Sequence, residues 1–182
     1  MQRFEVSVEY NGIVVFDPQV VRAHYGGRIA AGTNLFERFT STDEGDEALR
    51  AGLVVPVLAI DDAGYEVVVR ARGEPHAWDA HVLHRNHGFA LRIERRAVLA
   101  DLYALIDWDD DVSAECFELD WTAGCYRVDV DAFSSRESCG AVIEAGYLFG
   151  FERCATLPEP TAEAGAYMRV LDHPARGPER SP

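Results

Sequence analysis

The feature that most constrains the fold is a strict alternation of apolar and polar residues at the start of the chain. Apolar side chains occupy the even positions from 4 to 10, and glutamate or serine occupies the odd positions between them. A period of two predicts a β-strand with one face in a core and the other in water. Asn11-Gly12 follows, and residues 13–16 are again apolar. This dipeptide is typical of a two-residue type I′ hairpin, so the sequence predicts two paired strands.

Three further pairs of short apolar segments flank turn residues, and each pair is interpreted as a hairpin. They are residues 53–60 and 65–70 around 61–64, residues 80–85 and 89–93 around 86–88, and residues 116–119 and 126–133 around 121–124. Pro56 places the first of these strands at a sheet edge or a bulge. Residues 147–154 predict one more strand. Short strands joined by tight turns predict a mainly β fold, an antiparallel β-sandwich of the C2-like or jelly-roll-like kind.

The helical content is expected to be one or two short helices. Asp17 is a natural N-cap and Pro18 suits the first helical position, so residues 18–25 predict the first helix. Residues 43–51 are an acidic segment stopped by glycine, and they predict the second helix. Residues 97–108 fit either a helix or a strand, and both interpretations stay open.

The domain organisation follows from length and composition. The 182 residues and the hydrophobic content of 48% suffice for one sizeable core. We expect a single β-sandwich domain over residues 1–157. Residues 158–182 are rich in proline and are expected to form a partly mobile tail, in which residues 167–171 are a candidate last strand. The four cysteines are too widely spaced for C-x-x-C motifs and are expected to be buried free thiols.

The charge of the chain favours some partners and excludes some chemistry. There are 31 acidic against 17 basic residues, which gives a net charge of -14. Such a field repels nucleic acid and anionic membranes and attracts cationic proteins. All the basic residues are arginine, which excludes a Schiff-base lysine and a P-loop lysine. The first residues contain no apolar run of the kind that directs export, so a cytoplasmic location is expected.

Histidines gather between positions 76 and 87, and they carry an alternative interpretation of the chain as a metal-dependent enzyme of barrel type. The candidate ligands are His76, Asp79, His81, His84 and His87. Imidazole and carboxylate groups can bind zinc, iron or nickel. A strand over residues 80–85 would point His81 and His84 to opposite faces, which argues against a single site. We therefore expect no metal and no cofactor.

Other catalytic patterns are weak or absent. The chain contains no G-x-S-x-G nucleophile elbow and no G-x-G-x-x-G dinucleotide motif. Cys139 lies beside serine and glycine, but a lone cysteine is poor evidence for a nucleophile. The run 107–111 lacks the glycine of an EF-hand loop, although loop aspartates at one end of a C2-like sandwich can bind calcium. No catalytic residues are predicted, and calcium binding by this run stays open.

The densest signal lies in residues 107–131, where carboxylates are interleaved with aromatic residues and Arg127 is the one basic residue. The pattern suits a surface that grips a basic partner, because carboxylates attract cations and aromatic rings carry much of an interface's energy. The predicted partner-binding residues are Asp107, Trp108, Asp109, Asp110, Asp111, Glu115, Glu118, Asp120 and Trp121. In the last expected hairpin, four carboxylates would crowd one sheet surface, and a cationic partner would relieve their repulsion.

Two segments carry a family resemblance: F-E-V-S-V-E-Y-N-G-I-V-V-F-D at residues 4–17 and F-E-L-D-W-T-A-G-C-Y-R-V-D-V-D-A-F at residues 117–133. They resemble small bacterial inhibitor and immunity proteins, including the competence nuclease inhibitor (ComJ-like) family. The resemblance implies an acidic β-sandwich that neutralises a toxin, such as a nuclease, by direct binding, and it carries over no catalytic residues. The expected function is therefore an immunity protein for a cationic protein toxin. The alternatives are the metal-dependent enzyme and a non-catalytic accessory domain.

Overall fold

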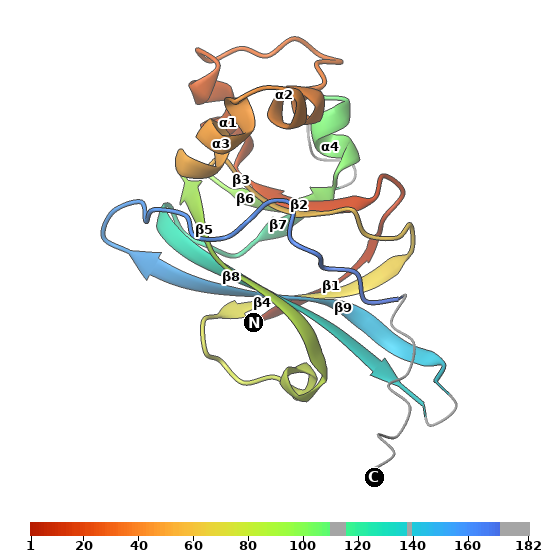
Figure 1. Cartoon of the computed structure of the whole chain (residues 1–182). Helices are drawn as coiled ribbons and strands as arrows, with labels where there is room; N and C mark the ends of the chain where they lie inside the picture. The colour runs from red at the N-terminus through yellow and green to blue at the C-terminus, as the bar shows by residue number, and fades with distance from the viewer. Residues whose placement is uncertain (110–115, 138–139, 172–182) are drawn as a thin grey trace.

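The computed structural model of the chain describes residues 1–109, 116–137 and 140–171. Its fold is mainly β, as predicted, and two sheets face each other (Figure 1). The larger sheet has the strand order β1 (Gln2–Ser7), β4 (Gly64–Ala71), β9 (Val142–Cys154), β8 (Gly124–Arg136) and β5 (Val82–Ile93). The smaller sheet has the order β3 (Val54–Leu58), β2 (Gly12–Phe16), β6 (Ala97–Asp101) and β7 (Phe117–Leu119).

Short helices complete the described part of the chain. They are α1 (Pro18–His24), α2 (Leu35–Ser41), α3 (Glu44–Arg50), α4 (Tyr103–Ile106) and the 3-10 helix η1 (Ala77–His81). The two predicted helices are confirmed as α1 and α3, and Asp17 caps α1 by accepting from the Gln19 amide at 2.8 Å. The expectation of one or two helices is too low, because α2 and α4 also form. None of these helices has the length and apolarity to cross a membrane.

The elements form three layers (Figure 1). The main core fills the space between the two sheets and includes Tyr65, Phe89 and Tyr147. The α-helices cover the other face of the smaller sheet, where a second core contains Trp108. On the outer face of the larger sheet, η1 packs through Trp78, which stacks on Phe133 of β8 with ring centroids 5.1 Å apart.

The larger sheet is mixed rather than purely antiparallel. Strands β4 and β9 run parallel, and their register pairs Glu66 with Gly146. The other strand pairs of the described residues are antiparallel. A parallel pair needs a long connection between its strands, so it leaves no local sign in the sequence.

The predicted strands exist except the candidate over residues 167–171, which forms no strand. Three of the predicted hairpins are wrong because their strands belong to different sheets. This holds for β1 and β2, for β3 and β4, and for β7 and β8. Asn11 does adopt the positive φ of a type I′ turn, at 55°. Its side chain, however, donates to the Ile60 carbonyl at 3.0 Å and to Asp62 Oδ1 at 2.9 Å. Asn11 therefore ties together two crossovers between the sheets instead of closing a hairpin.

The remaining predicted hairpin, over residues 80–93, is the continuous strand β5. Its expected turn, residues 86–88, is a bulge, because the register on β8 shifts between His87 and Phe89. Gly88 has a φ of 94°, which glycine adopts without strain. Residues 97–108, which could have been helix or strand, are divided between β6 and α4.

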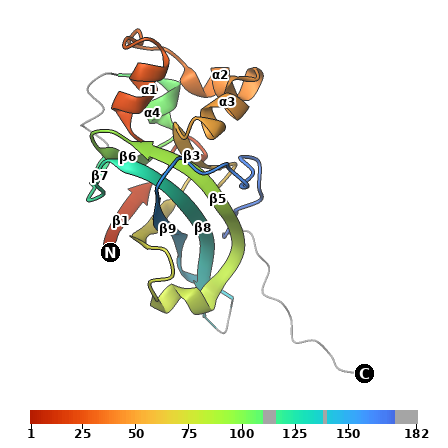
Figure 2. The same cartoon turned by 90° about the vertical axis from the view of Figure 1, so that its left-hand side faces the viewer.

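Residues 158–171, here called the strap, lie across one side of the sandwich (Figure 1). Met168 and Val170 are buried in the main core, at 2% and 0% exposure. The Tyr147 hydroxyl donates to the Met168 carbonyl, and the Arg136 guanidinium donates to the carbonyls of Val170 and Leu171. The strap docks without forming a strand. Strands β1 and β7 lie on the opposite side of the sandwich (Figure 2).

Gly146 tests the parallel pairing of β4 and β9. A Cβ at this position would overlap the Glu66 carbonyl of β4, whereas a Cβ on Gly150 of the same strand would meet Arg72 Cα at an ordinary 3.5 Å. We predict that Gly146→Ala lowers the free energy of unfolding by about 1–3 kcal/mol through overpacking. Gly150→Ala is the matched control and should change it much less. Urea denaturation measures both, and equal effects would contradict this register.

Candidate protein-binding groove

A groove of about 460 Å³ lies where the β1 edge of the larger sheet meets the β6 and β7 side of the smaller sheet. We call it the edge groove. It is lined by Glu5, Val6, Ser7, Glu9, Tyr10, Asp101, Tyr103 and Phe117. Its charged lining residues are all carboxylates, and no arginine lines it among the described residues. The groove therefore offers a negative site to a cationic ligand.

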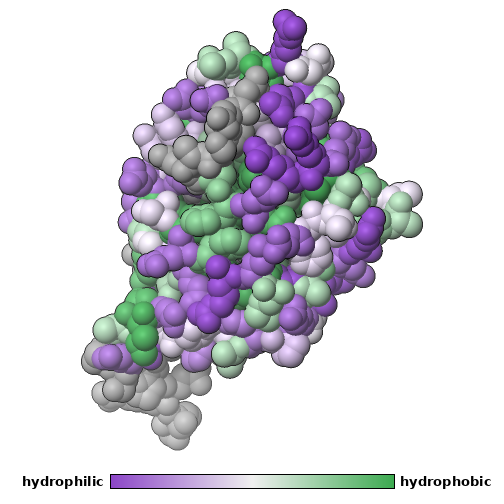
Figure 3. Space-filling model, turned by 180° about the vertical axis from the view of Figure 1, so that it is seen from behind, coloured by the Kyte–Doolittle hydropathy of each residue, from purple (hydrophilic) through white to green (hydrophobic). Residues whose placement is uncertain are grey.

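The groove also exposes aromatic surface. Tyr10 and Phe117 are 43% and 37% exposed. The Tyr10 ring lies against Tyr103 with centroids 4.7 Å apart, and Phe117 lies against Phe4 at 5.1 Å. Seen from behind, this side of the molecule shows apolar side chains near its middle with hydrophilic side chains around them (Figure 3). Supported rings of this kind suit the centre of a protein interface.

Asp101 fixes the upper part of the groove. Its Oδ2 atom accepts from the backbone amides of Glu9 at 2.8 Å and Tyr10 at 3.3 Å, and Oδ1 accepts from the Tyr103 amide at 2.7 Å. The Tyr103 hydroxyl donates to Asp107 Oδ2 at 2.6 Å. One carboxylate thus holds the segment after β1 against the start of α4.

Gln2 ties the start of β1 to β7, the strand that carries Phe117 of the groove. The Asp120 amide donates to Gln2 Oε1 at 2.8 Å, and Gln2 Nε2 donates to the Glu118 carbonyl at 3.5 Å. These bonds join the first residues of β1 to β7, more than a hundred residues later in the sequence. The two sheets beside the groove are therefore joined by hydrogen bonds of Asp101 and of Gln2 to backbone groups.

Only some of the partner-binding residues predicted from the sequence are exposed near the edge groove. Trp108 is 1% exposed in the helix-side core, so its predicted partner contact is wrong: it packs against Phe16 with centroids 6.1 Å apart. Trp121 is half-buried and stacks on Phe151 at 4.7 Å, so much of its ring serves the main core. Asp107, Asp109, Glu118 and Asp120 are exposed, but none of them lines the groove. Asp107 is joined to it through the Tyr103 hydroxyl, whereas Glu118 lies 3.7 Å from the Arg96 guanidinium. Asp110, Asp111 and Glu115 lie outside the described residues.

The expected crowding of four carboxylates on one sheet surface does not occur. Glu118 lies on β7 and Asp129 on β8, in different sheets. Asp129 instead forms an ion pair with Arg72 at 2.5 Å, and Asp131 contacts His87 at 2.6 Å. Asp131 also lies 3.6 Å from the Arg85 guanidinium, so each of these two aspartates has an arginine of the chain beside it.

The histidine cluster is dispersed. His76 Nδ1 accepts from the Trp78 amide at 3.3 Å, and Asp79 pairs with Arg70 through both oxygens, at 2.5 and 2.9 Å. Hydrogen bonding from Arg70 holds the pKa of Asp79 below its usual range. His81 packs on the Trp78 ring, His84 on the Tyr167 ring, and His87 on Asp131. In residues 1–109, 116–137 and 140–171, no three potential ligands come together for a metal ion. The three described cysteines, Cys116, Cys125 and Cys154, are half-buried thiols.

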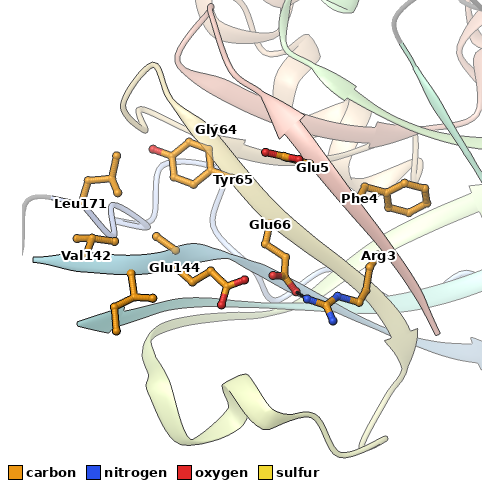
Figure 4. Close-up of a pocket in the computed structure, with 11 residues that line it drawn as sticks. Arg3, Phe4, Glu5, Gly64, Tyr65, Glu66, Val142, Glu144 and Leu171 are labelled. Carbon is orange, nitrogen blue, oxygen red and sulfur yellow. Dashed lines mark ion pairs between the residues drawn. The ribbon is translucent and has the colours of Figure 1, made fainter. Parts of the chain in front are cut away.

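A second hollow, of about 510 Å³, lies on the other side of β1 and holds a pair of carboxyl groups (Figure 4). Glu66 pairs with Arg3 at 2.7 Å and accepts from the Trp78 indole at 3.1 Å. The hydrogen bond with Glu66, followed by burial, raises the pKa of Glu144. Burial would raise the pKa of Glu66, but hydrogen bonds from Glu144, Arg3 and Trp78 outweigh it and lower that pKa. Of the two carboxyls, Glu144 is therefore the one that binds a proton more readily.

The sequence signal for the edge groove was present but incomplete. Glu5 and Glu9 are on the polar positions of the first alternating segment, and Tyr10 ends that segment. Nothing local shows that this segment lies beside Asp101 and Phe117, because the contact joins two different sheets.

Comparison with known proteins gives little further guidance. No protein-family model matches the chain, and no curated protein sequence matches it. A similar solved structure is that of ComJ from Bacillus subtilis, an inhibitor of the DNA-degrading activity of NucA. The two share 12% sequence identity over 85% of this chain and 96% of that chain, with a TM-score of 0.46. A likeness of this size assigns neither a family nor a partner.

Substitutions of Asp101 and Glu9 compare a carboxylate that holds the groove together with a carboxylate that is exposed in it. We predict that Asp101→Asn lowers the free energy of unfolding by about 1.5–3 kcal/mol, the usual contribution of a hydrogen bond to a charged group. Glu9→Gln removes the same charge from the same groove and should leave stability nearly unchanged. Thermal and urea denaturation check both variants. Equal stability of the two would show that Asp101 does not hold the groove.

Glu144 should make stability depend on pH. Because its pKa is raised, protonated Glu144 stabilises the fold at low pH, and this contribution is lost as the pH rises through the pKa of the folded state. Glutamine keeps a hydrogen-bond donor at every pH. We predict that Glu144→Gln raises the Tm at pH 7 by about 2–4 °C, the shift expected for about 1 kcal/mol. The difference from the unmodified protein should vanish below the ordinary glutamate pKa of 4.5. A constant difference across the pH range would contradict the raised pKa of Glu144.

Proposed function

We propose that this chain is a non-catalytic inhibitor that binds a cationic protein, and that the partner is a basic toxin of the nuclease class. The observation that carries the proposal is the edge groove, in which exposed aromatic rings lie among charged residues that are all carboxylates. Such a groove is complementary to a surface of arginine and lysine side chains with apolar stems.

The charge of the whole molecule supports the same partner class. The net charge of -14 attracts a basic protein over a long range and raises the rate of encounter. A nuclease has to present cations to the phosphates of its substrate. An acidic protein that covers those cations would block the substrate site, which is the simplest way for a binding protein to neutralise such an enzyme.

The binding energy would be concentrated on the rings. Tyr10 and Phe117 are each supported by a second ring, Tyr103 and Phe4, so little conformational entropy is lost when a partner covers them. The carboxylates around them would set orientation and association rate more than affinity. Glu5 and Glu9 therefore become the first choice for charge reversal, and Tyr10 the first choice for truncation.

The acidic residues of the 107–120 region belong to the proposal as the rim of the same surface. Asp107 is joined to the groove through the Tyr103 hydroxyl, and Asp120 follows Phe117 along the chain after β7. Asp110, Asp111 and Glu115 stay predictions from the sequence as further contacts to the cationic partner.

Charge reversal in the groove should weaken capture of the partner. We predict that Glu5→Lys/Glu9→Lys slows association by about tenfold or more and makes it less sensitive to salt, because steering by the groove is lost. Glu47→Lys/Glu159→Lys changes the net charge equally at exposed positions outside the groove and is the matched control.

The experiment uses the purified chain and both double variants as bait in parallel on extract of the source cells. Proteins captured by the unmodified chain are identified, purified and measured for binding kinetics and for nuclease activity. We expect a basic nuclease that is inhibited by the unmodified chain and by the control, and inhibited poorly by the groove variant. If all three baits capture the same proteins in equal amounts, the proposal is contradicted.

A further inference from the structure

We propose that the groove recognises an extended segment of its partner by adding it as a strand to the free edge of β1, and that this segment alternates basic and apolar residues. The inference rests on the proposed function, because it names the shape and chemistry of what the groove binds. Three observations support it: the direction in which the N–H and C=O groups of β1 point, the protection of the other sheet edges, and the charges along the groove.

The backbone groups of β1 point the right way. The Val8 amide donates to the Ala63 carbonyl at 2.8 Å, continuing the β1–β4 register, in which Val6 pairs with Tyr65. In an antiparallel pair, alternate residues turn their N–H and C=O groups to the same neighbour. The backbone groups of the even-numbered residues of β1 thus bond to β4. The N–H and C=O groups of Glu5 and Ser7 lie in the plane of the sheet and point away from β4, toward the position of a further strand.

The groove lies along this edge. It is lined by three successive residues of β1, Glu5 to Ser7, whose side chains lie on alternate faces of the sheet. Among the described residues, none of β4 lines the groove, and the lining residues opposite β1 are Asp101 of β6, Tyr103 of α4 and Phe117 of β7, so the groove lies on the side of β1 that faces away from β4. The place occupied by the groove is therefore the place of a further strand.

The other sheet edges of the described chain are less open to a partner. Strand β3 carries Pro56, which cannot donate a hydrogen bond. Strand β7 has only three residues. Strand β5 is covered in part by the strap, since the Thr161 amide donates to the Gly88 carbonyl at 2.9 Å and Asn86 bonds to Glu163. Proteins commonly protect edges in these ways. Strand β1 is tied to β7 near its start, through Gln2, and along the groove it carries the exposed side chains of Glu5 and Ser7.

Charge and shape define the segment. An added strand would place alternate side chains on the outer face beside Glu5, where a cation is favoured. Its other side chains would point to the inner side of the groove, toward the rings of Tyr103 and Phe117. A second copy of this chain would bring its own Glu5 and Glu9 to the same groove, so charge repulsion disfavours self-pairing.

The test uses a short blocked peptide that alternates arginine and valine, with two modified forms. One form carries N-methyl groups on the valine amides and the other on the arginine amides, so each lacks hydrogen-bond donors along one edge while keeping its charge. Strand addition predicts that one form loses at least tenfold in affinity and that the other binds nearly as the parent peptide. Attraction by charge alone predicts equal binding of all three and would overturn the inference.

Two measurements on the protein itself complete the test. Ser7→Pro removes an outward N–H from β1, at an edge position where proline is tolerated, and Ser7→Ala is its control. We expect weak peptide binding only for Ser7→Pro. Independently of whether that variant folds, bound peptide should slow amide hydrogen exchange at Glu5 and Ser7 of the unmodified chain. Unchanged exchange at both amides would overturn strand addition. A dimer that Ser7→Pro dissolves would show that the β1 edge pairs with a second copy of this chain, and would overturn the proposed partner segment.

The outcomes for this inference and for the proposed function are separable. A captured nuclease that depends on Glu5 and Glu9 but leaves the exchange of the Glu5 and Ser7 amides unchanged supports the inhibitor and contradicts strand addition. Peptide binding that fits strand addition, without any captured protein that depends on the groove, supports the strand site and contradicts the inhibitor.

Discussion

The Asp101 carboxylate is the interaction on which the candidate site depends. It ends β6 and accepts hydrogen bonds from three backbone amides, those of Glu9, Tyr10 and Tyr103. The bonds hold the crossover that leaves the larger sheet against the first turn of α4, which belongs to the smaller sheet's side. Because the amides satisfy the carboxylate without neutralising its charge, the same group that shapes the groove also contributes to its negative potential. Tyr10 and Tyr103 are brought ring to ring as a result.

The sandwich has two open sides, and the chain treats them differently. The strap closes one side with Met168 and Val170, whose side chains belong to the main core. On the other side, β1 meets β7 through hydrogen bonds of Gln2, and the space above them is left as the edge groove. A partner at the groove would thus complete the side that the chain does not cover with its own residues. This asymmetry, together with the excess of carboxylates, links the fold to the proposed inhibition of a cationic protein.

Local signals in the sequence predicted local structure well. Period-two alternation located β1, the Asp17-Pro18 pair located α1, and Pro56 placed β3 at an edge. Pairing could not be predicted, because turn residues report backbone conformation and not strand partners: Asn11 has the expected positive φ but lies in a crossover. For the site, composition identified the acidic and aromatic character. It misplaced Trp108, since an aromatic residue between aspartates can still point into a core, and it missed Glu5, Glu9 and Tyr10, which meet β6 and β7 only in the folded chain.

The central claim is that the carboxylates of the edge groove are covered by a cationic protein. Carbodiimide labelling of carboxyl groups, read residue by residue with mass spectrometry, measures this directly for the chain alone and in complex with its captured partner. We expect Glu5 and Glu9 to lose most of their labelling in the complex, while Glu47 on α3 and Glu159 on the strap label as before. Full labelling of Glu5 and Glu9 in the complex, with protection at Glu47 or Glu159, would contradict it.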